Sequence, residues 1–317
     1  MRIDVHAHYF PAEYMDCLAR LGSGRVERIA FAPGAGVTMD ERVELLDRTG
    51  VDMQVLSASL LQPDFAKSSD AVVAARLAND LYLDVCRKYR GRFEAFGVVP
   101  LPHVGEAITE VGRCLDTLGM VGLTVGCTVA GRFLDDPAFD PFFAELDRRS
   151  AVLFLHPVGA GAGPGTADYG LAWMIGAPVE DSVAALRLVL SGLTSRYPNI
   201  RVIVPHLGGI LPFLLRRLDD AFERQRVRGV PMGIDGPPSI YVRRLWFDTV
   251  SSHPAALRCA CDSFGADRLM LGSDFPYNAG AQYEYCVKYV KEAGLPEKDT
   301  TAILDKNAKT LLGLGKK

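Results

Sequence analysis

The chain opens with a short segment, Arg2–His8, that carries two histidines two residues apart. In an extended strand Asp4, His6 and His8 share one face, and the two imidazoles lie about 7 Å apart along the chain. Imidazoles so placed are a natural pair of ligands for one divalent metal ion. A His-x-His pair also occurs for packing reasons alone, so a metal site requires further ligands of the same type elsewhere.

Such ligands follow at the ends of later apolar runs, where His156, His206 and Asp274 stand. In a parallel barrel the carboxyl ends of all strands converge on one mouth, so residues far apart in sequence meet there. Three imidazoles and one carboxylate with one open position are typical of a catalytic zinc site. We therefore expect His6, His8, His156 and Asp274 to bind Zn²⁺, with Mn²⁺ left open because it accepts the same donors.

His206 is then free to transfer protons or to hold the substrate, and an ordinary histidine pKa near 6.5 suits proton transfer at neutral pH. Asp274 could contact both the metal and a bound water, so we count it as catalytic as well as a ligand. The aromatic residues Trp173, Phe275 and Tyr277 are expected to line a pocket for a planar substrate. Ordinary packing explains Trp173 and Tyr277 at least as well.

Eight short apolar runs alternate with amphipathic helical patterns, which predicts an α/β fold, a (β/α)8 TIM barrel with small insertions. The runs are Ile3–His8, Met53–Ser59, Phe93–Pro100, Val121–Cys127, Ala151–Pro157, Arg201–Leu207, Leu245–Ser251 and Leu269–Pro276. A doubly wound sheet is the alternative, because periodicity does not show closure. We expect one domain over residues 1–317. Gly22–Val37 is expected to hold a small β insertion, and the glycine-rich Val158–Gly170 is a candidate lid.

Composition excludes several classes of protein. With 317 residues, 49% of them hydrophobic, and a net charge of -3, the chain has no basic stripe for nucleic acid. No apolar run approaches the roughly 20 residues that span a bilayer, and the start lacks a signal-peptide pattern, so we expect a cytoplasmic location. The seven cysteines are odd in number and include no Cys-x-x-Cys, which argues against a disulfide framework.

Several motifs carry a resemblance to a known family. They are Asp4-x-His6-x-His8, His156-Pro157, Trp173 with Gly176-x-Pro178-x-Glu180, His206-x-Gly208-Gly209, Pro212-Phe213 with Arg217, Phe247-Asp248-Thr249-Val250 and Gly272-Ser273-Asp274-Phe275-Pro276. By these motifs nearly the whole chain resembles the amidohydrolase superfamily. Within it, the chain resembles the metal-dependent decarboxylases of aminocarboxymuconate semialdehyde, γ-resorcylate and 6-methylsalicylate.

The resemblance implies the same four metal ligands and a catalytic role for His206. It also implies that Arg42 and Arg217 grip a substrate carboxylate, with Arg217 reaching into a neighbouring subunit's site, hence a homodimer or higher homo-oligomer. For both arginines a solvated surface charge is the ordinary alternative. Salicylate-type relatives often carry Glu where His6 stands, so the chain leans towards the muconate-like or methylsalicylate-like subgroup.

The implied activity is non-oxidative decarboxylation of a small aromatic or muconate-semialdehyde-type carboxylic acid. The binuclear hydrolases of the superfamily resemble one another in a bridging lysine on the fourth strand, and Val121–Cys127 contains no lysine, so we expect one metal. A mononuclear hydrolase or lactonase, or a hydratase, is the alternative. A binding protein with a structural metal fits less well, because structural zinc sites are closed and usually rich in cysteine.

Overall fold

In the computed structural model, which describes residues 1–27 and 32–315, eight parallel strands form one sheet in the order β1-β2-β3-β4-β7-β8-β9-β10. Their bounds are β1 (Ile3–His8), β2 (Met53–Ser57), β3 (Phe93–Val98), β4 (Gly122–Gly126), β7 (Val152–His156), β8 (Arg201–Val204), β9 (Trp246–Asp248) and β10 (Leu269–Met270). The last strand region returns to the first, because the Val5 amide donates to the Leu271 carbonyl at 2.9 Å and Ala7 bridges Phe275. The predicted (β/α)8 barrel is confirmed, and the doubly wound alternative is wrong.

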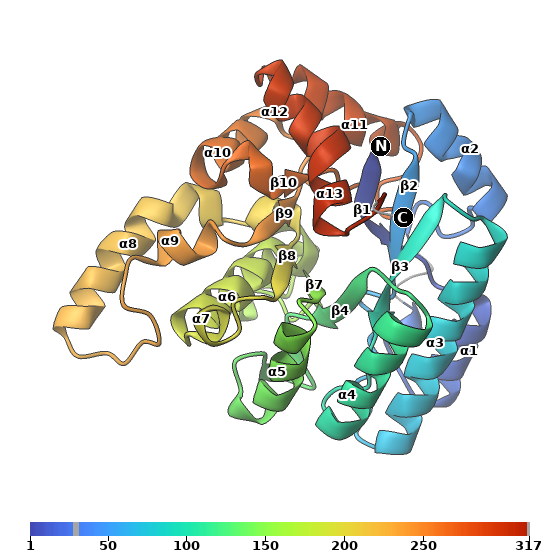
Figure 1. Ribbon diagram of the computed structural model, residues 1–317, viewed down its shortest axis with the longest axis horizontal. Coiled ribbons are helices and arrows are strands. Elements are labelled where there is room, and N and C mark those ends of the chain that lie inside the picture. Colours follow the sequence, from blue (N-terminus) through green and yellow to red (C-terminus); the bar gives the residue numbers. More distant parts are fainter. Residues whose placement is uncertain (28–31, 316–317) are drawn as a thin grey trace.

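Helices surround the strands in chain order (Figure 1). Their bounds are α1 (Ala12–Arg20), α2 (Met39–Thr49), α3 (Ser68–Lys88), α4 (Val104–Gly112), α5 (Asp140–Arg148), α6 (Ala177–Leu190), α7 (Leu193–Arg196), α8 (Leu211–Val227), α9 (Pro238–Val242), α10 (Pro254–Phe264), α11 (Ala281–Glu292), α12 (Glu297–Thr301) and α13 (Asn307–Leu311). Local sequence sets some of these ends. Thr38 and Glu41 form a reciprocal capping box at the start of α2, and Gly50 ends that helix in the left-handed region.

Two apolar cores follow from strand alternation. Inside the barrel, alternate residues such as Val152 and Phe154 of β7 pack together, and α13 covers this cluster with Ala308 and Leu311. The residues between them in sequence, such as Leu153, face the larger core between strands and helices. Because β7 continues this alternation, His156 extends the inward-facing row and reaches the barrel mouth.

Some expected elements differ from the structure. The last apolar run is a strand only over Leu269–Met270, because the chain then leaves regular geometry to reach Asp274. The pattern over residues 178–197 is two helices, since Gly192 adopts a φ of 75° between α6 and α7. In the expected β insertion at residues 22–37, the described positions 22–27 and 32–37 hold no strand, and positions 28–31 lie outside the described residues. A small hairpin, β5 (Thr128–Val129) with β6 (Arg132–Phe133), follows β4 instead.

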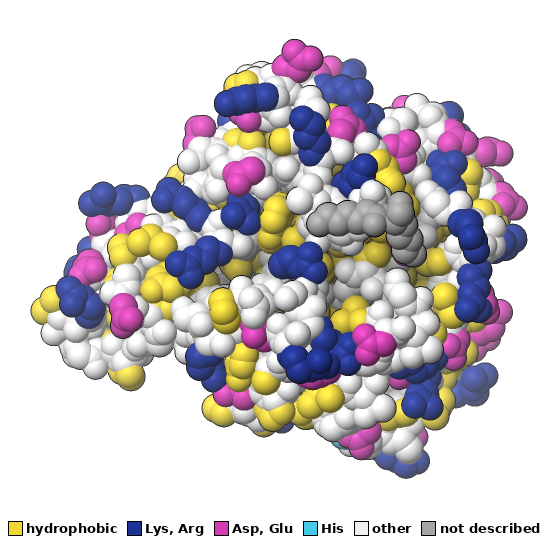
Figure 2. Space-filling model, in the orientation of Figure 1, with side chains coloured by type: hydrophobic (Ala, Val, Ile, Leu, Met, Phe, Trp, Pro, Cys, Tyr) yellow, Lys and Arg dark blue, Asp and Glu magenta, His cyan; other side chains and the backbone are white. Residues whose placement is uncertain are grey.

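Basic and acidic side chains are interspersed on the face in Figure 2, with apolar patches between them. This mixing agrees with the small net charge of -3. Among the described residues, no helix combines the length and the apolarity that a bilayer crossing requires.

Candidate metal centre and active site

Four predicted ligands meet where β1, β7 and the segment after β10 end. The Nε2 atoms of His6 and His8 lie 3.2 Å apart, and Asp274 Oδ1 lies 3.1 Å from the first and 3.0 Å from the second. The rings of His6, His8 and His156 have centroids 5.0, 5.1 and 4.8 Å apart and stand nearly perpendicular to one another. All three histidines are buried. Such a group of edge-on imidazoles around one carboxylate is arranged to surround a cation.

The first strand reaches this geometry through a β-bulge, which corrects the expectation that Asp4 shares a face with the histidines. The pairing register with β2 shifts between Asp4 and Ala7. Val5 therefore belongs to the interior cluster with Phe154, and the His6 ring packs on the same phenylalanine at 5.0 Å. Asp4 points away from the metal cluster, where Gln54 Nε2 donates to it at 2.8 Å.

Asp274 is held in an unusual backbone conformation, with a φ of 62°. A non-glycine residue in this region costs of order 1 kcal/mol, so neighbouring contacts must hold it there. Its amide donates to the His6 carbonyl at 2.8 Å. The preceding residue, Ser273, donates its amide and its hydroxyl to the buried Asp4 carboxylate at 3.0 and 2.6 Å. Asp4 therefore joins β1 to the turn that carries Asp274.

His156 provides the clearest sign that the site accepts a metal. Its Nδ1 lies 2.9 Å from the Pro157 carbonyl, which can only accept, so that nitrogen carries the hydrogen. Its Nε2 is left with a lone pair, and this buried atom has no hydrogen-bond partner. A cation bound among the donors would satisfy it, so the residues present fit a divalent metal.

The other two imidazoles are oriented in the same way. His6 Nδ1 lies 2.6 Å from Asp248 Oδ2, and His8 Nδ1 lies 2.9 Å from Ser57 Oγ. Partners on Nδ1 leave both Nε2 atoms facing the cluster. Asp248 thus supports the site from behind the ligands.

His206 lies at the edge of the cluster and is held by two carboxylates. Its Nδ1 is 2.8 Å from Asp181 Oδ2, its amide donates to Asp248 at 2.9 Å, and its Nε2 is 3.8 Å from Asp274 Oδ2. Burial disfavours the charged ring, but Asp181 and Asp274 outweigh it and hold the pKa of His206 well above its usual value.

Two overlapping donor sets are therefore present. Ligand atoms of His6, His156, His206 and Asp274 all lie within 4.8 Å of one another. His8 Nε2 is nonetheless nearer to Asp274, at 3.0 Å, than His206 Nε2 is, at 3.8 Å. With Asp181 favouring its charged form, His206 suits proton transfer better than coordination, so we keep His8 in the ligand set.

Metal binding should release protons. Burial would lower the pKa of His6, but Asp248 and Asp274 raise it to about 9. Burial lowers the pKa of His8 to about 4 and that of His156 well below the usual value. At pH 7.5 the metal-free protein thus holds His6 charged and the other two neutral, so binding expels about one proton.

Calorimetric titration of metal-free protein with Zn²⁺ in buffers of different ionisation enthalpy measures this number. The apparent affinity should rise about tenfold per pH unit up to pH 9 and then level off. A binding constant independent of pH between 7 and 9 would contradict the assignment of His6.

A cavity of about 670 Å³ opens over the cluster. His156, His206 and Asp274 line its polar side, and Trp173 and Tyr277 line its apolar side, so both aromatic residues lie where the sequence predicts them. Met174, which the sequence analysis did not single out, also lines it. The volume suits a small organic molecule.

Three predicted substrate contacts do not line the cavity of their own chain. Phe275 is buried in the core behind Asp274 and is not among the lining residues. Arg42 is buried too, with its guanidinium 4.1 Å from the Phe275 ring and Nη2 donating to the His8 carbonyl at 2.6 Å. Arg217 is exposed on α8. The structure thus places Arg42 as a support of the metal-binding strand.

Two carboxylates on α6 support the site, although the sequence analysis assigned a role to neither of them. Asp181 orients His206, and Glu180 accepts hydrogen bonds from the amides of Val158, Gly159 and Ala160 at 2.7, 3.2 and 3.1 Å. Glu180 therefore anchors the start of the glycine-rich loop considered as a lid. The sequence signal that could have indicated these roles is a pair of adjacent acidic residues in a helix whose other buried residues are mostly apolar.

The chain is similar to several known proteins. A family model described as amidohydrolase matches residues 3–314. The chain is 29% identical to 2-amino-3-carboxymuconate-6-semialdehyde decarboxylase of Dictyostelium discoideum, over 99% of this chain and 92% of that protein. It is 29% identical to γ-resorcylate decarboxylase of a Rhizobium strain, over 87% of each. The crystal structure of 5-carboxyvanillate decarboxylase from Sphingomonas paucimobilis superposes with a TM-score of 0.88, at 25% identity over 98% of each chain.

Proposed function

The chain belongs to the amidohydrolase family, and from that premise we propose that it is a metal-dependent decarboxylase, a carboxy-lyase that releases CO2 from a small carboxylic acid. The substrate class we infer is an aromatic acid of salicylate type or a muconate-semialdehyde-type acid. The observation that carries the proposal is the orphaned Nε2 of His156 among three other donors on the floor of an apolar-walled cavity. The names of the relatives support the same reaction.

We propose one divalent metal, Zn²⁺ before Mn²⁺, held by His6, His8, His156 and Asp274. Three nitrogen donors and one oxygen donor favour zinc, although manganese accepts them as well. A bound metal would supply a Lewis acid beside the substrate's carboxylate and its neighbouring oxygen. The fourth strand offers Thr124 rather than a lysine, and the Thr124 hydroxyl is bonded to Ser59 at 2.9 Å, which fits one metal rather than two.

His206 performs the proton transfer in this proposal. Asp181 holds Nδ1, so Nε2 faces the cavity and can deliver its proton to the substrate carbon that bears the carboxylate. That carbon becomes tetrahedral and the adjoining π system becomes electron-poor. The C–CO2 bond then breaks, its electron pair returns to the π system, and neutral CO2 leaves. Trp173 and Tyr277, on the apolar side of the cavity, hold the planar part of the substrate and exclude water.

Metal analysis with a CO2-release screen tests this function. The purified protein should contain about one equivalent of metal per chain and should decarboxylate at least one salicylate, resorcylate or muconate semialdehyde. Ring opening of lactones with all aryl carboxylates left untouched would favour a mononuclear hydrolase. Two bound metals per chain would also count against the decarboxylase.

We infer a homodimer in which Arg217 completes the partner's cavity. Met174, which lines the cavity, is 74% exposed, and Phe213, at the start of α8, is 85% exposed. The amide of Ile210, just before α8, donates to Ser182 of α6 at 2.9 Å, so the start of α8 is joined to the helix that follows Met174. Burial of such a surface against a second copy would bring each Arg217 towards the other cavity.

Mixing subunits of two inactive variants tests whether Arg217 completes the partner's cavity. Arg217→Ala and His206→Ala chains should each be inactive as homodimers, and mixing them should restore roughly a quarter of wild-type activity, because one of the four sites in a random mixture is complete. Sedimentation velocity of Phe213→Glu should show dissociation to monomers. No recovery in a mixture with verified subunit exchange would leave Arg217 as a surface charge.

We also propose one catalytic domain spanning the chain and a cytoplasmic location. Each of the seven cysteines is a free thiol, which suits a reducing compartment.

A further inference from the structure

A chain of buried hydroxyl groups leads away from the metal cluster behind His8. His8 Nδ1 lies 2.9 Å from Ser57 Oγ, Ser57 Oγ lies 3.1 Å from Ser59 Oγ, and Ser59 Oγ lies 2.9 Å from Thr124 Oγ1. All three hydroxyl residues are at most 1% exposed. The chain therefore crosses from the end of β2 to β4 through the protein interior.

Counting protons fixes the directions of the hydrogen bonds next to His8. Each hydroxyl has a single hydrogen, and Ser57 donates its own to Ser59. Ser57 must then accept from His8, which places the hydrogen on Nδ1 and the lone pair on Nε2. Ser59 Oγ accepts from Ser57 and lies 2.9 Å from Thr124 Oγ1, and in this second contact either oxygen can be the donor.

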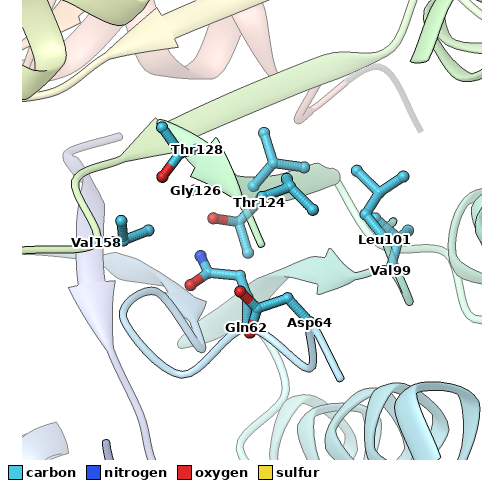
Figure 3. A pocket seen from close by; sticks show the side chains of 10 residues that line it. Gln62, Asp64, Val99, Leu101, Thr124, Gly126, Thr128 and Val158 are labelled. Atoms are coloured by element: carbon cyan, nitrogen blue, oxygen red, sulfur yellow. The ribbon is translucent and has the colours of Figure 1, made fainter. Parts of the chain in front are cut away.

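When Ser59 donates in this contact, the Thr124 hydrogen is available to a second, small cavity that Thr124 lines. This cavity has a volume of about 10 Å³, close to the smallest space that holds one water. Gln62 and Thr124 both line it, from the loop after β2 and from β4 (Figure 3). Both polar atoms of the Gln62 amide are buried and have no hydrogen-bond partner. A hydroxyl that can donate and an amide without partners therefore border the same small space.

We propose that this cavity binds one structural water, which accepts from Thr124 and donates to Gln62 Oε1, and that the chain from Gln62 to Ser57 positions the His8 ring for metal binding. The inference rests on the proposed function only in taking His8 as a metal ligand. Thr124 and Gln62 are then positioning residues that contact neither the metal nor the substrate. Their effect passes through the tautomer and the ring angle of His8.

Thr124→Val tests the proposal, because valine keeps the shape and removes the hydroxyl, and Thr124→Ser is the matched control that keeps it. The dissociation constant for Zn²⁺ is measured by competition with a chromophoric chelator. The solvent exchange of the imidazole N–H signals is measured by proton NMR on the Co²⁺-loaded protein. Thr124→Val should weaken Zn²⁺ binding about tenfold and speed exchange of one imidazole hydrogen, whereas Thr124→Ser should match the wild type.

Wild-type Zn²⁺ affinity and unchanged exchange in Thr124→Val would overturn the proposal. If that variant does not fold, Gln62→Met provides the second test, since it fills the cavity and should weaken Zn²⁺ binding about threefold. A high-resolution crystal structure with no density between Thr124 and Gln62 would also overturn it. His8→Ala distinguishes failure of the proposed metal site from failure of the hydroxyl-chain proposal. Unchanged Zn²⁺ affinity in His8→Ala would remove His8 from the metal site itself. Weakened affinity in His8→Ala together with wild-type affinity in Thr124→Val would refute only the role of the hydroxyl chain.

Discussion

His206→Ala should retain its metal and lose turnover by about 10²–10⁴-fold, the usual contribution of a positioned acid or base. Metal binding and proton transfer fall to different residues, because His206 Nε2 lies 3.8 Å from Asp274 while its Nδ1 is held by Asp181 at 2.8 Å. Metal content measured by plasma mass spectrometry and kcat measured by CO2 release check the prediction together. His253→Ala is the matched control, since His253 is exposed at the start of α10 and its side chain makes no capping bond.

Full activity in His206→Ala would refute the catalytic role, and loss of the metal would move His206 into the ligand set. Asp181→Asn sharpens the distinction. An amide cannot balance the charged imidazole as a carboxylate does, so the kcat profile should shift to lower pH while metal content stays constant. An unshifted profile would leave Asp181 with a packing role only.

Much of this site could be predicted from the sequence because strand ends are readable. Runs of buried apolar residues locate the strands, and parallel topology brings their carboxyl ends to one mouth. His156 and Asp274 could be assigned in this way although 118 positions separate them in the numbering. The fold was predicted from eight apolar runs that alternate with helical patterns. Only the closure of the strands into a barrel required the structure.

The errors come from local geometry that periodicity cannot encode. Strict alternation placed Asp4 beside the histidines, but a bulge in β1 inserts one residue and turns Asp4 towards Gln54. The neighbour of Asp274 was expected in the pocket, but the positive φ at Asp274 aims Phe275 into the core. Asp181 was missed because its role depends on where α6 packs against His206, which is a tertiary contact.

Arg42 illustrates a different limit. Its position in the sequence matches a family residue that binds substrate carboxylate, yet here its Nη2 donates to the His8 carbonyl and its plane covers Phe275. Its Nε remains without a partner. A side chain that binds a backbone carbonyl and also packs on an aromatic ring affects the substrate chiefly by fixing β1. A motif match cannot distinguish this indirect effect from direct contact with the substrate.

Asp274→Asn should lose both metal and rate, with Zn²⁺ affinity falling by at least about 100-fold and turnover falling with it. Asparagine is the informative replacement, because it tolerates the φ of 62° as well as aspartate does. Alanine would add backbone strain of about 1 kcal/mol to the loss of the carboxylate. The asparagine variant therefore isolates the charge that lies 3.1 and 3.0 Å from the His6 and His8 nitrogens.

Chelator competition and CO2 release measure the two losses on the same preparation, and Asp267→Asn, on an exposed carboxylate, is the control. The variant should also release fewer protons on metal binding. The pKa of His6 is raised by Asp248 and Asp274 against the effect of burial, and the variant lacks one of those carboxylates. Metal retained at the wild-type affinity would remove Asp274 from the coordination sphere, and the cluster would then be His6, His8, His156 and His206 without a carboxylate.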